Sequence, residues 1–263
     1  MNKRKTILVT NDDGFESLGL KALVEALKPL GRVIITAPSN EKSACAHSMT
    51  LARPLRFIEI DDDFYKLDDG TPTDCVFLAL NAHFDEGDRP DLVVSGINRG
   101  SNMGEDITYS GTAGGAMEGV LQGIPSIAFS QVCKDKCQNI LDFGYDLAAD
   151  VAYDLAKKVL DGDFPLGERK FLNVNIPPIH KDQCKGYKIT NAGKRIYANS
   201  AHLHRNPRGE EYYWIGLPAF EWDKRGDEHI CDLDAIKMGY VSITPVHLDM
   251  TSYDDIALLK EWI

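Results

Sequence analysis

The chain has 263 residues, of which 43% are hydrophobic and 26% are charged, so it can bury a core without disulfides or a structural metal. Its formal net charge of −11 argues against nucleic acid or an anionic membrane as the main partner, because such a surface repels polyanions. There is no signal-peptide pattern and no apolar run near the roughly 20 residues that span a bilayer, so we expect a cytoplasmic protein with reduced cysteines.

The first half of the chain alternates strand-like and helix-like segments. Thr6–Thr10 is a β-branched run that ends in turn residues, as a buried parallel strand does. Residues 18–30 have leucines at helical spacing, with Ser17 as an N-cap, and Arg32–Pro38 is a second apolar strand. This βαβ opening predicts an α/β fold with a Rossmann-like, doubly wound, mostly parallel sheet.

The same alternation continues to about residue 177. Thr71 and Asp74 flank Pro72 at the beginning of an apolar segment, a pattern that predicts a helix start. Further strands are predicted at 91–96, 125–130 and 171–177, and further helices at 110–121 and along the stripe Leu147, Val151, Leu155 and Val159.

The rhythm changes in the C-terminal third. Residues 188–222 mix aromatic residues with Asn, Pro and Gly, which predicts an extended β-hairpin arm outside the main sheet. A strand at 239–245 and a terminal helix at 253–263 follow. We therefore divide the chain into a Rossmann-like core, residues 1–180, and a C-terminal extension, residues 181–263.

An acidic pair, Asp12 and Asp13, follows the first strand within the motif NDDG. Ligands bind at the carboxyl ends of the strands in such sheets, and adjacent carboxylates are costly to bury unless a cation neutralises them. Oxygen ligands favour Mg²⁺ or Mn²⁺. The alternative is a solvated turn in which either side chain caps backbone amides. Neither a GxGxxG fingerprint nor a P-loop is present, which counts against NAD chemistry and ordinary ATP hydrolysis.

The loop after the strand at 91–96 is rich in Gly and Asn. Asn98 and Asn102 offer oxygen ligands or amide donors, and Arg99 can add a charge-assisted contact to a phosphate. Taken alone, the segment also fits a long polar connection with no role in binding.

Two further segments carry hydroxyl groups. Ser110, Gly111 and Thr112 open a helix, where free N–H groups favour phosphate, although an ordinary N-cap has the same pattern. The loop 39–48 has several hydroxyl groups, a lysine and a histidine. Because all four loops follow strands of one sheet, they predict a metal site beside an anion cradle, which is the combination that phosphoester hydrolysis needs.

The motifs ILVTNDDG, APSNEKSACAHSMTL, GTPTDC, DLVVSGINRGSNMG, YSGT and GYVSITPVHLDMT resemble, in this order, those of the SurE survival-protein family of 5′-nucleotidases. The resemblance implies one divalent ion per subunit, Mg²⁺ or Mn²⁺, held by Asp12, Asp13, Ser43 and Asn98. Ser43 rests on the resemblance alone, because spacing does not separate it from Ser39, Ser48 or His47.

The resemblance also implies a phosphate and substrate pocket formed by Asn102, Ser110, Gly111 and Thr112. The implied activity is hydrolysis of nucleoside 5′- and 3′-monophosphates, and in some members of short polyphosphate. The family forms homodimers or homotetramers through C-terminal elements, which fits the aromatic arm.

One feature departs from the family pattern. Some members have a histidine after the late LxxD segment, whereas this chain has Tyr253 at the corresponding distance from Asp249, with His247 before it. Two rival functions remain: a phosphatase with an aspartyl nucleophile, whose DxDx[TV] spacing NDDG lacks, and a nucleotide-binding sensor that uses the same pocket without turnover.

Overall fold

The computed structural model describes residues 4–85, 87–133, 143–162, 164–196, 201–215, 221–223 and 230–263. It is an α/β protein with a mostly parallel sheet, as predicted. In chain order its elements are β1 (Thr6–Thr10), α1 (Leu18–Leu27), η1 (Lys28–Leu30), β2 (Arg32–Pro38), β3 (Phe57–Asp61), β4 (Phe64–Leu67), α2 (Pro72–Ala82), β5 (Leu92–Arg99), η2 (Gly104–Thr108), α3 (Gly111–Leu121), β6 (Ser126–Gln131), α5 (Asp146–Leu160), β7 (Lys170–Ile176), η4 (Lys181–Gln183), β8 (Tyr187–Ile189), β9 (Lys194–Ile196), β10 (Ala201–Arg205), β11 (Glu211–Ile215), β12 (Glu221–Asp223), α6 (Asp232–Lys237), β13 (Val241–His247) and α7 (Asp255–Trp262).

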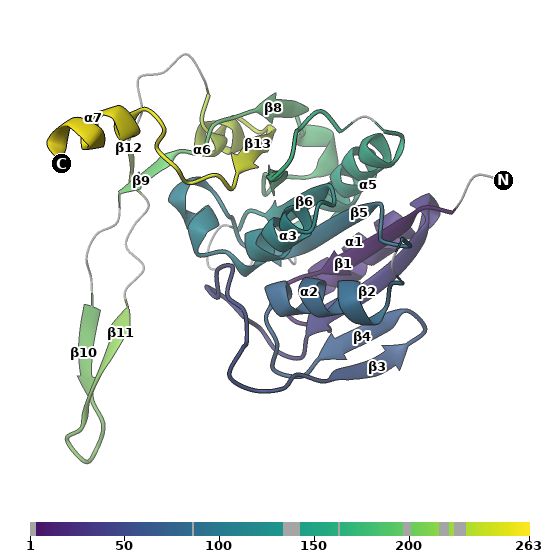
Figure 1. The fold of residues 1–263 in the computed structure, drawn as a ribbon, viewed down its shortest axis with the longest axis horizontal. Coiled ribbons are helices and arrows are strands. Elements are labelled where there is room, and N and C mark those ends of the chain that lie inside the picture. The colour runs from purple at the N-terminus through teal and green to yellow at the C-terminus, as the bar shows by residue number, and fades with distance from the viewer. Residues whose placement is uncertain are drawn as a thin grey trace.

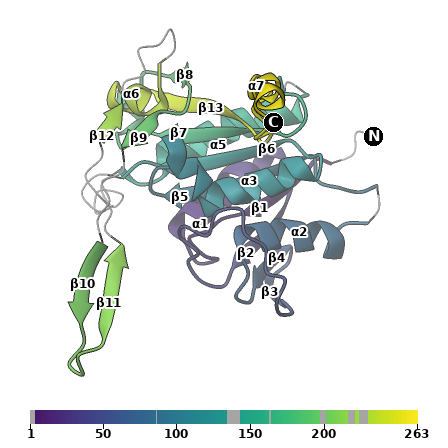
Figure 2. The same cartoon turned by 60° about the vertical axis from the view of Figure 1, so that its left-hand side comes forward.

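Nine of the described strands form the main sheet, in the order β3-β4-β2-β1-β5-β6-β7-β13-β8. The six strands from β4 to β7 run parallel, while β3 and β13 run antiparallel to their neighbours β4 and β7. Helices α1 and α5 cover one face of the sheet, and α2 and α3 cover the other (Figures 1 and 2). This is the strand order of a doubly wound, Rossmann-like sheet.

The central strands are buried on both faces. In β1, Ile7 and Val9 belong to the same apolar cluster as Leu20 of α1, whereas Leu8 packs on the opposite face with Val76 of α2. Side chains of a strand alternate between the two faces, so a strand covered on both sides needs apolar residues throughout. This is why TILVT shows no alternation of apolar and polar residues.

The predicted helix starts are confirmed at their caps. The Ser17 hydroxyl accepts a hydrogen bond from the backbone of Leu20, at 3.3 Å. Thr71 and Asp74 form a reciprocal capping box at the beginning of α2, and the Ser110 hydroxyl caps α3. In each case a local side chain satisfies a backbone N–H group that has no partner within the helix.

Two features of the first half differ from the prediction. Strand β5 continues to Arg99 instead of ending at Gly96, so Asn98 lies on the strand and not in the loop after it. The antiparallel pair β3–β4 was not predicted. Its strands are short, β3 lies at the sheet edge with half-buried and exposed side chains, and aromatic pairs such as Phe57 with Tyr65 replace a continuous apolar run.

The prediction that residues 188–222 lie wholly outside the main sheet is wrong at their beginning. Strand β8 (Tyr187–Ile189) pairs in parallel with β13 at the sheet edge. Its side chains are all exposed, so no apolar pattern marks it; it joins the sheet through its backbone hydrogen bonds with β13, and the Tyr187 hydroxyl also donates to Asp154. Beyond it, the β10–β11 hairpin projects away from the sheet (Figure 1), while residues 197–200 and 216–220 of the predicted arm lie outside the described residues.

Cys133 is disulfide-bonded, so the expectation of reduced cysteines is wrong at this residue. Sulfur proximity in the folded chain decides pairing, and sequence spacing alone does not reveal it. Cys45, Cys75, Cys184 and Cys231 are free thiols, and Cys137 lies outside the described residues. Among the described helices, none has the length and apolar character needed to cross a membrane.

Candidate metal and phosphate site

The predicted site residues converge at the point where the winding of the sheet reverses. Strands β1 and β5 are neighbours, yet β1 leads into α1 on one face and β5 leads toward α3 on the other. Ligands of open α/β sheets bind in the crevice that this reversal opens at the carboxyl ends of the strands. Asp12 and Asp13 follow β1 there, and Asn98 lies near the end of β5.

Asp12 is nearly buried, with 5% of its surface exposed. Its carboxylate accepts a hydrogen bond from the hydroxyl of Thr112 in the first turn of α3. Burial raises the pKa of Asp12 to about 7; the hydrogen bond from Thr112 opposes this rise, and the charge of Asp13 adds to it. Because the ionised form is poorly solvated here, a bound cation would stabilise it.

Asp13 is half-buried beside it. Its carboxylate accepts a hydrogen bond from the backbone N–H of Arg99, at 2.8 Å. Burial is the largest influence and raises the pKa of Asp13, the Arg99 N–H lowers it, and the charge of Glu41 raises it. Arg99 was predicted as a phosphate contact through its guanidinium, and the structure adds that its backbone orients Asp13.

The loop between β2 and β3 brings Ser43 to the same crevice. The backbone N–H of Lys42 donates to the carbonyl of Asp12 at 2.7 Å, which holds the loop against the end of β1. The Ser43 hydroxyl is exposed and donates to Glu41 at 2.6 Å. Of the alternatives that spacing left open, Ser39 accepts a hydrogen bond from the backbone of Asp69 and His47 pairs with Glu118.

The two asparagines of the β5 segment have different environments. Asn98 donates through its amide nitrogen to the carbonyl of Gly100 at 3.0 Å, so its amide oxygen is the atom that can face a cation. Asn102 is buried, and its amide nitrogen donates to the Ser130 hydroxyl at 2.8 Å. Asn175 receives a hydrogen bond from the backbone of Asn102 at 2.9 Å and donates to its carbonyl at 3.1 Å.

The amino end of α3 lies directly against Asp12. The Ser110 hydroxyl caps the helix, and Gly111 follows it. A β-carbon on Gly111 would lie 2.6 Å from the sulfur of Cys45 and 2.9 Å from the β-carbon of Asp12. Glycine therefore permits the close approach of the helix, so that the first turn of α3, including the backbone of Thr112, stands against Asp12.

The donor set fits a hard divalent cation. No cluster of three or more His, Cys, Asp or Glu side chains with metal-binding geometry occurs in the described parts of the chain. Two adjacent carboxylates with a hydroxyl and an amide oxygen nearby suit Mg²⁺ or Mn²⁺, which prefer oxygen, and not zinc, which is usually bound by histidine and cysteine.

Sequence reasoning missed the pair His47–Glu118, which ties the Ser43 loop to α3. His47 and Glu118 are joined at 2.9 Å, and Gln122 donates to the same carboxylate at the same distance. Burial raises the pKa of Glu118, but the hydrogen bonds from His47 and Gln122 lower it more, so the net pKa lies below the ordinary value. The two partners are 71 positions apart, which no local pattern reveals.

Replacement of Glu118 by Gln is expected to lower the free energy of unfolding by about 1–2 kcal/mol at pH 7. The pKa of Glu118 is lower in the folded state than its unfolded value of about 4.5, so the ionised carboxylate stabilises the fold above pH 4.5. This stabilisation is lost as the pH falls through the folded-state pKa. The difference between variant and wild type should therefore shrink below pH 4.5 in urea titrations. The exposed Glu25→Gln serves as the control, and a pH-independent difference would contradict the assignment.

The C-terminal candidates lie on exposed segments. The Tyr253 hydroxyl donates to Asp249 at 2.7 Å, and this hydrogen bond lowers the pKa of that carboxyl. His247 is the last residue of β13 and is also exposed. The structure therefore pairs Asp249 with Tyr253 and gives no histidine in the expected place.

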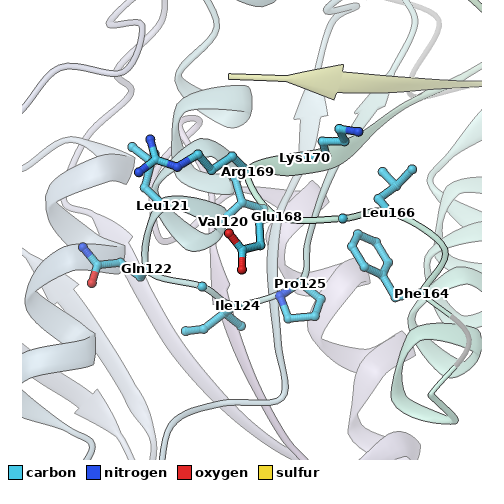
Figure 3. Close-up of a pocket in the computed structure, with 12 residues that line it drawn as sticks. Val120, Leu121, Gln122, Ile124, Pro125, Phe164, Leu166, Glu168, Arg169 and Lys170 are labelled. Carbon is cyan, nitrogen blue, oxygen red and sulfur yellow. The ribbon is translucent and has the colours of Figure 1, made fainter. Parts of the chain in front are cut away.

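A cavity of about 660 Å³ lies elsewhere (Figure 3). Its walls include Gln122 and Pro125, which precede β6, and Arg169, which precedes β7. These are the amino ends of the strands, so the cavity is at the edge of the sheet opposite to Asp12 and Asp13.

Comparison with known proteins identifies the same family along most of the chain. Residues 7–199 match the family model described as survival protein SurE. The 5′-nucleotidase SurE of Sulfurovum sp. is 60% identical, covering 100% of this chain and 99% of its own, and that of Nitratiruptor sp. is 58% identical, covering 98% and 100%. The crystal structure of the SurE protein from Aquifex aeolicus superposes with a TM-score of 0.82 at 45% identity, covering 98% of this chain and 99% of that chain.

Proposed function

Because the chain belongs to the SurE family, we propose that it is a metal-dependent 5′-nucleotidase that hydrolyses nucleoside monophosphates to a nucleoside and inorganic phosphate. One observation carries the proposal: the acidic pair Asp12–Asp13 lies at the switch point of the sheet, against the amino end of α3. The proposed cation site and the proposed anion site are thus adjacent, which is the arrangement that hydrolysis of a phosphomonoester requires.

We assign the metal site to Asp12, Asp13, Ser43 and Asn98, with one Mg²⁺ or Mn²⁺ per subunit. The carboxylates supply the charge, and the hydroxyl and amide oxygens complete an all-oxygen set. When bound, a divalent cation at this place supplies an activated water and polarises a phosphoryl oxygen. We also propose that the protein is cytoplasmic.

The substrate phosphate is assigned to the amino end of α3, with Ser110, Gly111 and Thr112, and to Asn102 and Arg99. Backbone N–H groups at a helix amino end stabilise the negative charge that the phosphoryl oxygens carry. Thr112 also orients Asp12 through its hydroxyl, and the backbone of Arg99 orients Asp13. Each of these two residues therefore links the metal side of the crevice to the phosphate side.

The test is phosphate release from a panel of nucleoside 5′- and 3′-monophosphates and short polyphosphate, with Mg²⁺, Mn²⁺ or EDTA. We expect release from 5′-monophosphates that depends on the metal and stops with EDTA. A folded protein that binds nucleotide without turnover under every metal condition would instead identify a sensor. A phosphorylated aspartate trapped during turnover would favour the aspartyl nucleophile.

We further propose that residues 181–263 form an extension to the core of residues 1–180 and hold the subunits of a homodimer or homotetramer together. Helix α7 has no buried residue, and its Trp262 is 82% exposed. The β10–β11 hairpin likewise exposes Tyr213 and Trp214. Apolar surface of this kind marks a protein interaction site, and a second copy of the chain is the partner that the family resemblance indicates.

Replacement of Leu259 by Asp on α7 is expected to dissociate the oligomer, because a charge would be buried in an apolar contact. Leu259 is 54% exposed in the single chain, so the variant subunit itself should still fold. Sedimentation equilibrium measures the mass of each species, and Lys260→Asp places the same charge on the neighbouring position as a control. A wild-type chain that sediments as a monomer would contradict the proposal.

A further inference from the structure

The segment between Asn102 and Ser110 connects two residues of the proposed phosphate pocket. It comprises Met103, the 3₁₀ helix η2 (Gly104–Thr108) and Tyr109. Its amino end is fixed by the core, because Asn173 and Asn175 of β7 both donate to the carbonyl of Asn102. Its middle, however, is held by residues from beyond position 190.

Asp232, the first residue of α6, is completely buried beneath this segment. One carboxylate oxygen accepts a hydrogen bond from the backbone N–H of Gly104 at 2.7 Å. The other accepts from Gly193 at 3.0 Å and from Leu233 at 2.8 Å. The side chain thus joins η2, the segment leading into β9 and the beginning of α6 at one point.

A second anchor acts on the next residues of η2. Arg195 of β9 is 9% exposed, and its guanidinium forms an ion pair with Asp106. Its backbone N–H donates to the carboxylate of Glu105. Met103 adds an apolar contact, because it packs in one buried cluster with Leu233 of α6. Strands β9 and β12 and helix α6 lie together beside β13 in both views (Figures 1 and 2).

From these contacts we infer that Asp232, supported by Arg195, is a positioning residue for nucleotide hydrolysis: it holds η2 so that Asn102 and Ser110 stand correctly spaced around the substrate phosphate. The C-terminal extension thereby completes the catalytic site without touching the substrate. The inference rests on the proposed function, and it concerns the phosphate side of the site, since Asp232 contacts none of the proposed metal ligands among the described hydrogen bonds.

Asp232→Asn is the sharpest variant because it keeps the shape of the side chain. Both carboxylate oxygens accept from N–H groups, so an amide must turn its own NH₂ group toward one of these donors. Asp234→Asn, the same change on the same helix, is the matched control. Arg195→Met loosens η2 from the second anchor and serves if Asp232→Asn does not fold.

Three quantities are measured: kcat and KM for a nucleoside monophosphate, Mn²⁺ affinity by calorimetry, and amide hydrogen exchange of residues 103–110. We expect a loss of kcat/KM of about 10- to 100-fold, since small displacements of binding groups have effects of this size. KM should rise, exchange of 103–110 should become faster, and Mn²⁺ affinity should stay within about twofold of wild type, as the metal ligands lie elsewhere.

The inference would be overturned if Asp232→Asn folds and has the same kinetics and the same amide hydrogen exchange as Asp234→Asn. It would also be overturned if the variant lost Mn²⁺ affinity by the same factor as kcat/KM, because that result indicates a general disruption of the site. If only Arg195→Met folds, the same three measurements on that variant test the inference. A wild-type protein that hydrolyses no nucleotide would instead overturn the proposed function. That result is distinct from an active wild-type enzyme whose kinetics do not change in Asp232→Asn, which overturns only the role of Asp232.

Discussion

Replacement of Asp13 by Asn is expected to reduce metal-dependent phosphate release by roughly 10³-fold, equivalent to about 4 kcal/mol of transition-state stabilisation. The backbone N–H of Arg99 donates to the carboxylate of Asp13. In the variant this donor would keep the amide oxygen on its own side, and the NH₂ group would then face the cation. The substitution therefore removes a charge and also presents a donor where the metal needs an acceptor.

Phosphate release at saturating Mn²⁺ measures the effect, and calorimetry of Mn²⁺ binding identifies its origin. Asp62→Asn is the control, because Asp62 is an exposed residue of the turn between β3 and β4. Asp13→Asn should lose both metal affinity and turnover while its thermal unfolding stays close to that of wild type. Turnover at the wild-type rate with a normal metal dependence would mean that Asp13 is not a ligand.

Replacement of Gly111 by Ala is the second large effect that we expect. The added β-carbon would meet the sulfur of Cys45 at 2.6 Å and the β-carbon of Asp12 at 2.9 Å, distances that force the helix to move. Such overpacking costs about 1–3 kcal/mol of folding free energy. Because α3 carries the proposed phosphate site, the displacement should also lower kcat/KM by about 100-fold.

The control is Gly167→Ala, because a β-carbon on Gly167 meets no atom within 4 Å. Thermal unfolding and steady-state kinetics are measured on both variants. The expected pattern is a loss of activity in Gly111→Ala that is larger than its loss of stability explains, and wild-type behaviour in Gly167→Ala. An active Gly111→Ala enzyme with an unchanged KM would mean that the close approach of α3 to Asp12 has no catalytic role.

Local signals predicted much of the fold because their physical cause is local. Strands β1 and β2 begin and end where their apolar runs do, and the caps Ser17, Thr71 and Ser110 begin their helices as predicted. A cap satisfies the N–H groups of its own first turn, so its signal lies within four residues. The β3–β4 hairpin and β8 lacked such a signal, because short strands at or next to the sheet edge are joined through backbone hydrogen bonds and tolerate exposed side chains.

The candidate site was predictable in part for the same reason. Polar residues at or just after the carboxyl ends of successive parallel strands share an edge of the sheet, so the sequence places Asp12, Asp13 and Asn98 at one edge. Ser43 required the family resemblance, since several side chains of its loop have equivalent spacing. In the structure His47 contacts Glu118, Ser39 contacts Asp69, and the Ser43 hydroxyl contacts Glu41.

The sequence by itself determined the class of fold, the edge of the sheet to which we assign the site and the oxygen chemistry of the acidic pair, because these follow from residue type and from order along the chain. Only the tertiary structure decided that β1 and β5 are neighbours at the switch point and that Thr112 reaches Asp12. It also decided that Asp232 supports Gly104 across 128 positions. Such contacts depend on which face of the sheet each connecting helix covers, and no single segment of the chain determines that arrangement by itself.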